Sequence, residues 1–370
     1  MVAITEELRE ALYLDETKLV VVDHPVGTEV HTTDKFRPSG PFPPGEIWTV
    51  ENRHPLLKAI TLEGADVTAA LLETDGRLVS PARLRLPQLR GLAEPHGVVL
   101  DFGTLPADRP LVLVLTGWLR FGGGWANVAA SQDPDLPFPF PRLEVETAAG
   151  AWQPVDVVVG APSGKTKTIL VDLAGKVPAG RHRLRLSAAY EIHWDRIALF
   201  ERRAANDTTI TRLAPSATDL HWHGFSRFAD LPWTQPLTPI HDAVSPNPAW
   251  SITPAGWCTR YGAVDELLAA ADNAVVILNG GDEVTVSFAA DRLPAKPAGS
   301  VRDFFIYNVG WDKDADFHVA LGWQVDPVPW AGMDDQRYGA LPRPAFPSDD
   351  QMRRFTTRWV APFTLQRAAK

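Results

Sequence analysis

The chain contains almost no cysteine and no long hydrophobic run. Its one cysteine, Cys258, excludes an intrachain disulfide and a cysteine-rich metal site. That thiol is a candidate nucleophile, although a lone cysteine is commonly a small buried hydrophobe. No apolar stretch approaches the roughly 18 residues that a membrane-spanning helix needs, so we expect no membrane span. Residues 1–16 carry several acids and lack the apolar core of a signal peptide, so we expect no export signal in them.

Basic clusters and familiar catalytic motifs are also missing. The net charge is −9 and no run of Lys and Arg stands out, whereas binding to duplex nucleic acid needs a concentrated basic face. We therefore expect no nucleic-acid partner. The Gly-x-Ser-x-Gly motif of serine hydrolases is absent. Gly160 precedes Gly164-Lys165-Thr166 with one residue too few for a P-loop, and the residues that follow alternate like a strand.

Proline and glycine are abundant, at 33 and 27 of 370 residues. Together they interrupt about one residue in six, which favours short strands and irregular loops over long helices. Between about residues 95 and 200, apolar or alternating runs follow one another with turns at close intervals. This pattern is typical of an antiparallel β-sandwich. We predict that this part of the chain is mainly β.

Outside that region the sequence predicts a mixture of helices and strands. The predicted helices cover residues 5–13, 64–76, 264–272 and part of 348–359. The predicted strands cover residues 19–23, 29–33, 47–54 and 302–311, with residues 29–33 beside 19–23. Residues 274–288 are predicted to form a hairpin that turns at Gly-Gly-Asp, and residues 204–219 are expected to join two domains.

His221 and His223 form a His-x-His pattern around Trp222. On a strand, residues i and i+2 project from the same face, so both imidazoles can reach one ion. His241 and Asp242, a short distance along the chain, can complete the site. The pattern predicts a His-bound transition metal. The alternative is a pair of half-buried or surface histidines beside a packed tryptophan.

A second candidate metal site consists of Asp312, Asp314 and Asp316. Three carboxylates at this spacing offer the oxygen ligands that calcium takes in its binding loops. The glycine that such a loop has at its sixth position is replaced by Phe317, and Trp323 stands where the final glutamate belongs. The alternative is a solvated turn after a strand.

Aromatic and amide side chains crowd the glycine-rich segment 117–132, GWLRFGGGWANVAASQ. Indole rings stack on the C–H faces of sugars, amides bond to hydroxyl groups, and glycines let a backbone approach closely. The residues that form this candidate carbohydrate site are Trp118, Trp125, Asn127 and Gln132. The alternative is that the tryptophans belong to the core and the glycines to a flexible turn.

Trp194, Asp195 and Arg196 follow the start of a predicted strand. An Asp–Arg pair beside a tryptophan can hold a ligand. The alternative is an ion pair that fixes the end of a strand at the edge of a sheet.

Several stretches together resemble the C-terminal region of large bacterial proteins. They are LVVVDHP (19–25), GLAEPHGVVLDFG (91–103), GKTKTILVDL (164–173) and EIHWDRIAL (191–199), and the resemblance spans about residues 15–340. Those proteins carry FG-GAP (VCBS) repeats and an ASPIC/UnbV module, often with tetratricopeptide repeats. The resemblance implies a surface or secreted location and an adhesive or recognition role. It brings no catalytic residues.

Two of these stretches also look like strands of a galactose-binding-like jelly roll. HGVVLDFG (96–103) is similar to its opening strand and WDRIAL (194–199) to its closing strand. This resemblance implies sugar binding through loops at one end of the sandwich, often beside a structural calcium ion.

The predicted organisation has three parts: an N-terminal α+β segment (1–92), a jelly-roll β-sandwich (93–203) and a second β-rich α+β domain with a proline-rich tail (204–370). The expected function is non-catalytic recognition of a carbohydrate or a protein partner through aromatic loops. The alternatives are a metal-dependent enzyme centred on His221, His223 and His241, and a structural scaffold within a larger assembly. A β-sandwich can serve all three.

Overall fold

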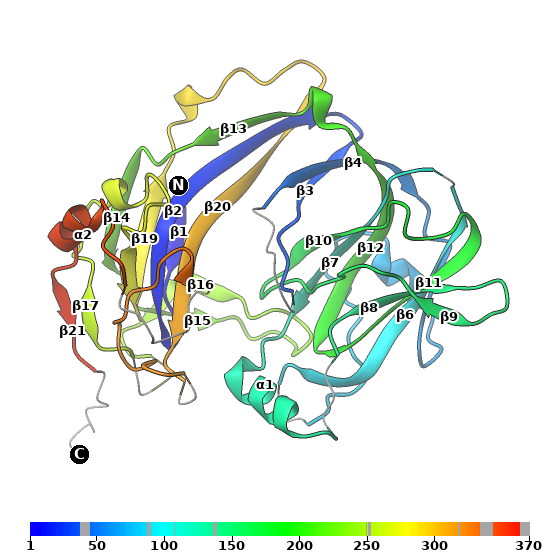
Figure 1. Cartoon of the computed structure of the whole chain (residues 1–370), viewed down its shortest axis with the longest axis horizontal. Coiled ribbons are helices and arrows are strands. Elements are labelled where there is room, and N and C mark those ends of the chain that lie inside the picture. Colours follow the sequence, from blue (N-terminus) through cyan, green and yellow to red (C-terminus); the bar gives the residue numbers. More distant parts are fainter. Residues whose placement is uncertain are drawn as a thin grey trace.

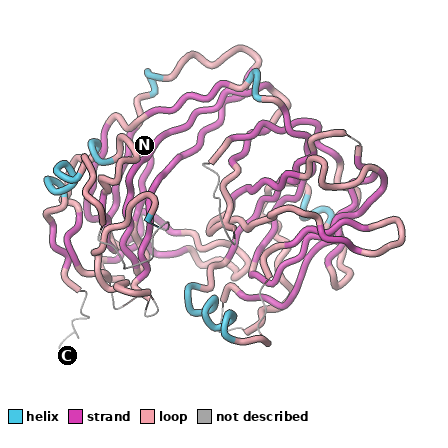
Figure 2. Tube along the Cα trace, in the orientation of Figure 1, coloured by secondary structure: helices cyan, strands magenta, loops and turns pink. Residues whose placement is uncertain are grey.

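The computed structural model describes residues 1–37, 45–86, 90–106, 108–135, 139–248, 250, 253–316, 319–333 and 343–362. The chain is mainly β, with 47% strand and 9% helix, which confirms that part of the prediction. Figure 1 shows two lobes, a sandwich (residues 29–203) and a second lobe (residues 1–25 and 209–360). Strands run through both lobes, and the few helices lie at the periphery (Figure 2). None of the helices in the described ranges is long and apolar enough to cross a membrane.

The sandwich consists of two antiparallel five-stranded sheets. The first has the order β10-β7-β12-β4-β3, with β3 (Glu29–Thr32), β4 (Ile47–His54), β7 (Leu111–Leu119), β10 (Lys167–Asp172) and β12 (Ile192–Arg203). The second has the order β5-β6-β11-β8-β9, with β5 (Lys58–Thr61), β6 (Leu92–Leu105), β8 (Arg142–Glu146), β9 (Trp152–Pro154) and β11 (Gly180–Tyr190). Buried side chains from both sheets form one hydrophobic cluster.

Strand β7 is buried on both of its faces. Its sequence, LVLVLTGWL, has almost no polar alternation, and all of its residues are buried. Leu113 and Leu115 belong to the cluster between the sheets, whereas Val112 and Val114 belong to another cluster on the opposite face. A continuous apolar run is typical of a central strand that is covered on both sides.

The second lobe is built on β2 (Glu10–Pro25). One edge of β2 pairs along its length with β20 (Ser300–Asp314), and its other edge pairs with β18 (Val276–Asn279) and then with β13 (Thr209–Leu213). In Figure 1 the far ends of β2, β13 and β20 arch toward the sandwich. These strands therefore connect the two lobes along one side.

A three-stranded sheet of order β1-β19-β14 packs beside β2. Its strands are β1 (Val2–Thr5), β14 (Ala217–Trp222) and β19 (Asp282–Ser287). In β19, Val284 and Val286 point into the core of the lobe, so Glu283 and Thr285 face the other side of the sheet. The outer covering consists of β17 (Gly256–Cys258), α2 (Asp349–Phe355) and β21 (Arg358–Val360).

A two-stranded arm reaches from the second lobe to the sandwich (Figure 1). Its strands are β15 (Phe225–Phe228) and β16 (Pro239–Ser245). The loop between them is bonded to the sandwich: the Trp118 indole N–H donates to the Thr234 carbonyl at 3.0 Å, and the Gln235 amide donates to the Gly76 carbonyl at 3.1 Å. The arm is thus a second connection between the lobes.

Three of the predicted helices are wrong. Residues 5–13 enter β2, because Ala11 and Tyr13 pair with both β18 and β20 and are buried there. Good helix formers are overruled here by tertiary pairing. Residues 64–76 and 264–272 contain only the short 3₁₀ helices η1 (Thr68–Leu71) and η3 (Asp265–Leu267). Two further 3₁₀ helices among the described residues are η2 (Ala205–Asp207) and η4 (Ala290–Arg292). Helix α2 confirms the predicted helix near residue 350.

The predicted hairpin at residues 274–288 is also wrong. The chain turns at Gly280-Gly281, but β18 joins the sheet of β2 while β19 joins that of β1 and β14. Similarly, β3 is hydrogen-bonded to β4 rather than to residues 19–23. The strands of residues 1–92 are divided between the lobes: β1 and β2 lie in the second lobe, and β3, β4 and β5 lie in the sandwich.

Candidate metal centre

The centre is built around Glu283 on β19. In the sheet, Glu283 lies directly between Thr5 of β1 and His221 of β14. Side chains at paired positions of neighbouring strands share one face, so this carboxylate points toward the arm, away from the core valines. Glu283 is only 3% exposed. A buried carboxylate needs positive or hydrogen-donating partners.

Three histidines surround the Glu283 carboxylate. His241 Nε2 lies 2.7 Å from Oε2, His221 Nε2 lies 3.3 Å from Oε1, and His223 Nδ1 lies 3.7 Å from Oε2. The rings of His223 and His241 are stacked, with centroids 4.2 Å apart and an interplanar angle of 23°. The structure therefore brings together all three histidines that the sequence analysis singled out.

The backbone conformation at two places, a glycine turn and a β-bulge, orients the histidine side chains toward Glu283. Strand β14 ends at Trp222, and the next residue, His223, donates its N–H to the Gly281 carbonyl at 2.9 Å. Gly281 has φ +92°, and a Cβ there would lie 2.2 Å from the Trp222 ring, so the turn before β19 requires glycine. In the arm, residues 241–243 form a bulge between the paired positions 240 and 244. The bulge presents His241 to Glu283, since bulges re-aim side chains.

The donor set suits a transition metal of the zinc class. His223, His241 and Glu283 each offer a ligand atom, and these atoms all lie within 4.8 Å of one another. Two imidazoles and one carboxylate form the protein ligand set of many catalytic zinc sites. Within the described ranges the buried Nε2 of His223 has no hydrogen-bond partner, and such an orphaned nitrogen needs an explanation. The His221 and His241 side chains are 36% and 52% exposed, so the cluster is open on one side.

Two carboxylates outside the cluster lie close to the outer ring nitrogens of the two exposed histidines, His221 and His241. Asp242 is fully exposed and lies 3.3 Å from His241 Nδ1, while Asp219 lies 3.1 Å from His221 Nδ1. The predicted ligand Asp242 is thus placed behind His241 rather than among the converging donors. Hydrogen bonds to Glu283 and then to Asp242 raise the pKa of His241 above its ordinary value. A carboxylate that orients a ligating histidine from behind is common at zinc sites.

The structure keeps two aspartates of the predicted calcium site, Asp312 and Asp314, together and places the third, Asp316, elsewhere. Asp312 and Asp314 lie on one face of β20 and meet Glu10 of β2, with ligand oxygens within 4.8 Å of one another. Asp316 is buried and forms an ion pair with Arg9. Burial, followed by repulsion from Asp312 and Asp314, raises the pKa of Glu10 to about 8. Glu10 therefore holds a proton at neutral pH, which relieves the crowding of like charges.

Trp118 of the predicted carbohydrate loop and Trp194 of the Asp195–Arg196 candidate are core residues. Trp118 is 2% exposed and its ring stacks on His193 at 4.4 Å; Trp194 is 3% exposed and belongs to the sandwich core. Neither ring has a face open to a sugar. The glycine-rich segment forms α1 (Gly123–Gln132), on which Asn127 and Gln132 are exposed. The side chain of Trp125 lies outside the described part of the structure.

Asp195 and Arg196 have structural partners. The Asp195 carboxylate accepts the backbone N–H groups of Asp75 and Gly76 at 3.2 and 3.0 Å. Arg196 is bidentate to Glu29 at 2.7 and 2.9 Å. Both residues therefore hold loops and strands of the sandwich in place, and neither is free for a ligand.

Cys258 is fully buried in the second lobe. Burial raises the pKa of its thiol to about 11. A nucleophilic cysteine must be a thiolate at working pH. Cys258 is therefore a small buried hydrophobic residue, the alternative given by the sequence.

Glu283 is the residue of the centre that the sequence analysis missed. It lies 60 residues after His223 on another strand, and only the register of β19 with β14 brings it to the histidines. The one local signal is the pair of acids, Asp282 and Glu283, at the start of the strand DEVTVS. No protein-family model matches the chain, and no curated protein matches it.

Proposed function

We propose that this protein binds a divalent transition-metal ion of the zinc class at His223, His241 and Glu283, and that it uses the ion in catalysis. The observation that carries the proposal is the convergence of these donors on one another, with a buried carboxylate and an orphaned buried imidazole nitrogen. A bound ion would replace the proton between His241 and Glu283 and would be held by a ring nitrogen of His223 as its third ligand. His221 is positioned as a hydrogen-bond donor to Glu283.

The open side of the cluster supports a catalytic rather than a purely structural ion. Structural zinc sites have four protein ligands, whereas catalytic sites have three and leave one position for water or substrate. A zinc ion in such a site polarises a carbonyl or phosphoryl oxygen and lowers the pKa of bound water. Asp242 would orient His241 and hold its proton on Nδ1, so that Nε2 faces the ion.

Metal analysis of the purified protein tests this proposal. After incubation with zinc and exhaustive dialysis, we expect about one equivalent of metal per chain in the wild type and less than a tenth of that in His223→Ala. His182→Ala is the matched control, because His182 lies in the sandwich, bonded to the Glu146 carbonyl at 2.7 Å. It should load like the wild type. Equal metal content in all three proteins, or none in the wild type, would refute the proposal.

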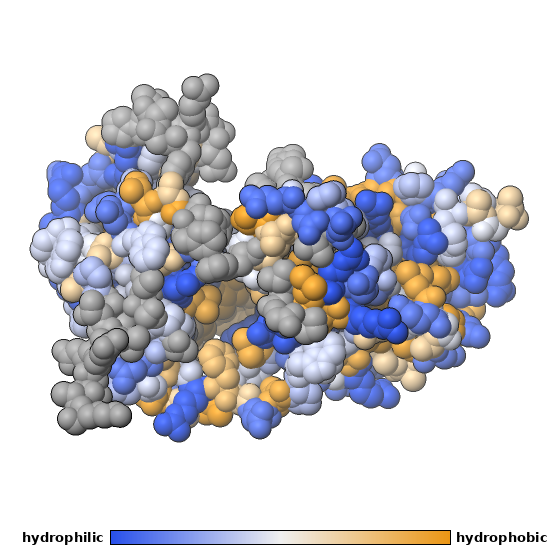
Figure 3. All heavy atoms as spheres, turned by 90° about the horizontal axis from the view of Figure 1, so that it is seen from below, coloured by the Kyte–Doolittle hydropathy of each residue, from blue (hydrophilic) through white to orange (hydrophobic). Residues whose placement is uncertain are grey.

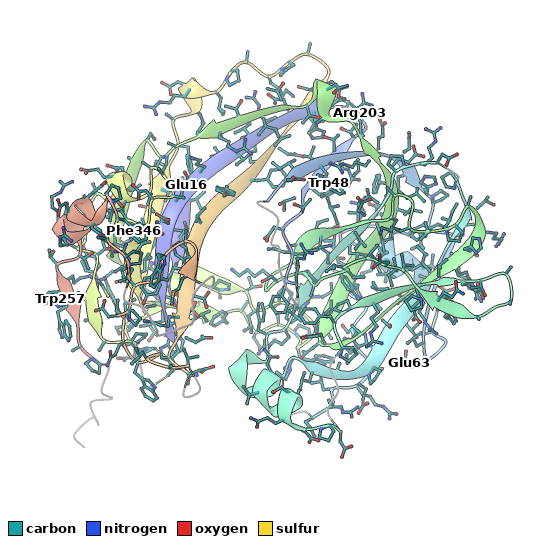
Figure 4. The ribbon with its side chains drawn as sticks, viewed as in Figure 1. Glu16, Trp48, Glu63, Arg203, Trp257 and Phe346 are labelled. Carbon is teal, nitrogen blue, oxygen red and sulfur yellow. The ribbon has the colours of Figure 1, made fainter. Side chains whose placement is uncertain are left out.

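A second candidate function is carbohydrate recognition, now at a different place. Trp257 and Trp359 are directly paired across β17 and β21, are 50% and 56% exposed, and have ring centroids 5.3 Å apart. Trp257 points away from the outer edge of the second lobe (Figure 4). Exposed indole faces of this kind stack on sugars.

We also propose that the sandwich is a galactose-binding-like jelly roll, in keeping with its two five-stranded antiparallel sheets, and that the chain is related to the FG-GAP/ASPIC group of surface or secreted bacterial proteins.

A glycan array tests carbohydrate recognition at Trp257 and Trp359. We expect binding that Trp257→Ala weakens by roughly 1 to 3 kcal/mol and that Trp152→Ala, in the sandwich, leaves unchanged. An array with no positive glycan, or hits unaffected by Trp257→Ala, would remove this candidate.

A further inference from the structure

An open groove of about 490 Å³ lies between the sandwich and the arm. Its walls include the large apolar side chains Leu8, Phe121, Phe228 and Leu237, which are 57%, 49%, 48% and 51% exposed. Figure 3 shows hydrophobic residues in the hollow where the two lobes meet. Exposed apolar side chains gathered in one concave place are typical of a ligand site.

The groove also carries two cations. Arg120 and Lys165 line it, and in the described part of the chain neither side chain has a carboxylate partner. Arg120 is half-buried beside Arg90, which takes both oxygens of Glu191. Burial, and then repulsion from Arg90, lowers the pKa of Arg120, although attraction to Glu191 opposes this shift. An anion in the groove would give Arg120 a partner that it does not have to share with Arg90.

One acid, Glu7, also lines the groove. Its two carboxylate oxygens accept the N–H and the hydroxyl of Ser226 at 2.9 and 2.8 Å, so they are turned toward the arm rather than toward Arg120 or Lys165. The groove therefore combines apolar walls with two cations and one acid, an excess of positive charge. This combination matches a small molecule that has an apolar body and an anionic head group.

The groove is adjacent to the metal centre. Thr5 lines the groove and lies directly opposite Glu283 in the β1–β19 register. Pro239 lines it too, two residues before His241 on β16. A molecule that occupies the groove therefore lies one strand away from Glu283 and two residues along β16 from His241.

We infer that the groove binds a small amphipathic anion, an aliphatic or aromatic body with a carboxylate, sulfonate or phosphate group, and that this is the substrate class of the metal centre. The second half of this inference rests on the proposed function; the binding itself does not. Arg120 and Lys165 recognise the anion, and the apolar walls hold the body.

A pair of fluorescent probes tests the binding. The probe 8-anilinonaphthalene-1-sulfonate has an apolar body and an anionic group, and N-phenyl-1-naphthylamine has the same body without the charge. We expect Arg120→Gln to weaken the sulfonate about tenfold, and Lys165→Gln to weaken it less because Lys165 is more exposed. Both variants should leave the uncharged probe within twofold of the wild type. Leu237→Asp should weaken both probes.

The matched control is Lys167→Gln, because Lys167 is paired with Asp34 at 3.0 Å and does not line the groove. It should change neither probe. Sulfonate binding that is unaffected by Arg120→Gln, or weakened equally by Lys167→Gln, would overturn the inference. All titrations are done first in EDTA, so that a failure of metal binding leaves this result standing.

Zinc loading then tests the assignment as substrate class. In the wild type, we expect zinc to raise the affinity for the sulfonate by several-fold, because it adds positive charge beside the groove. The same addition to Glu283→Gln should have no effect. If zinc binds stoichiometrically but leaves sulfonate affinity unchanged, the groove is not the substrate site of the metal centre, while the proposed metal binding stands.

Discussion

Glu283→Gln is expected to lose zinc affinity by on the order of a hundredfold or more. The substitution keeps the size of the side chain and removes the only negative charge that the three histidines share. Substitution of a residue that hydrogen-bonds to a metal ligand typically lowers metal affinity 10- to 100-fold. Loss of the charge of a ligand itself should therefore lower the affinity by about 100-fold or more. Isothermal titration with zinc measures the effect. Glu144→Gln, which removes a carboxylate bonded to Arg185 in the sandwich, is the control and should bind zinc as the wild type does.

The same variant makes a prediction about His241 in the absence of metal. Its pKa is raised chiefly by the hydrogen bond to Glu283, so in Glu283→Gln the pKa should fall back toward the ordinary value of about 6.5. The raised pKa stabilises the folded wild type below about pH 6.5, and this contribution is lost as the pH rises through the folded-state value. NMR titration of the imidazole follows the shift. An unchanged titration, together with unchanged zinc affinity, would show that Glu283 does not organise the cluster.

Arg90→Ala is expected to destabilise the fold by about 3 kcal/mol at pH 7. Arg90 neutralises Glu191, whose side chain is fully buried at the start of β12. Removing one partner of a buried ion pair typically costs 3 to 5 kcal/mol, and Arg90 is partly exposed, which favours the lower value. Urea denaturation gives the difference. Arg183→Ala, which breaks an exposed pair with Glu146, should cost less than about 1 kcal/mol.

The effect of Arg90→Ala should depend on pH. Burial opposes ionisation of Glu191, but His193, with Nε2 3.5 Å from the carboxylate, and the hydrogen bonds from Arg90 and the Gly91 N–H prevail and lower its pKa to about 2. In the wild type this interaction is fully present above pH 4.5 and is lost as the pH falls toward 2. The difference between wild type and variant should therefore shrink over this range. A constant difference would mean that Arg90 acts through packing, for example against the Trp233 ring 5.6 Å away.

The sequence predicts those elements whose signal is local. The apolar run of β7 and the alternating residues of β10 identify strands, and the short helix near residue 350 has its own acidic start and basic end. The helix predicted at residues 5–13 fails because β2 is formed by pairing with β20, almost 300 residues away. The local sequence of residues 5–13 contains no information about a pairing strand so far along the chain.

In the candidate site, too, the features that depend on nearby residues are predicted from the sequence and those that depend on strand pairing are not. The His-x-His spacing and the proximity of His241 in sequence are local, and the histidines do converge. Glu283 becomes their partner only through strand register, and the bulge at residues 241–243 aims His241. The tryptophans misled the analysis for a related reason: Trp118 and Trp194 are buried by packing that composition does not reveal, while the exposed Trp257 and Trp359 meet only when β17 pairs with β21.

The most direct test of the metal centre is the zinc K-edge X-ray absorption spectrum of the zinc-loaded wild type. The account predicts a first shell of nitrogen and oxygen at about 2.0 to 2.1 Å, with the outer-shell scattering of two imidazoles and no sulfur. In His223→Ala the imidazole scattering should decrease with the metal content. A shell containing sulfur, which only Cys258 or a methionine can supply, or a shell without imidazole, would contradict it.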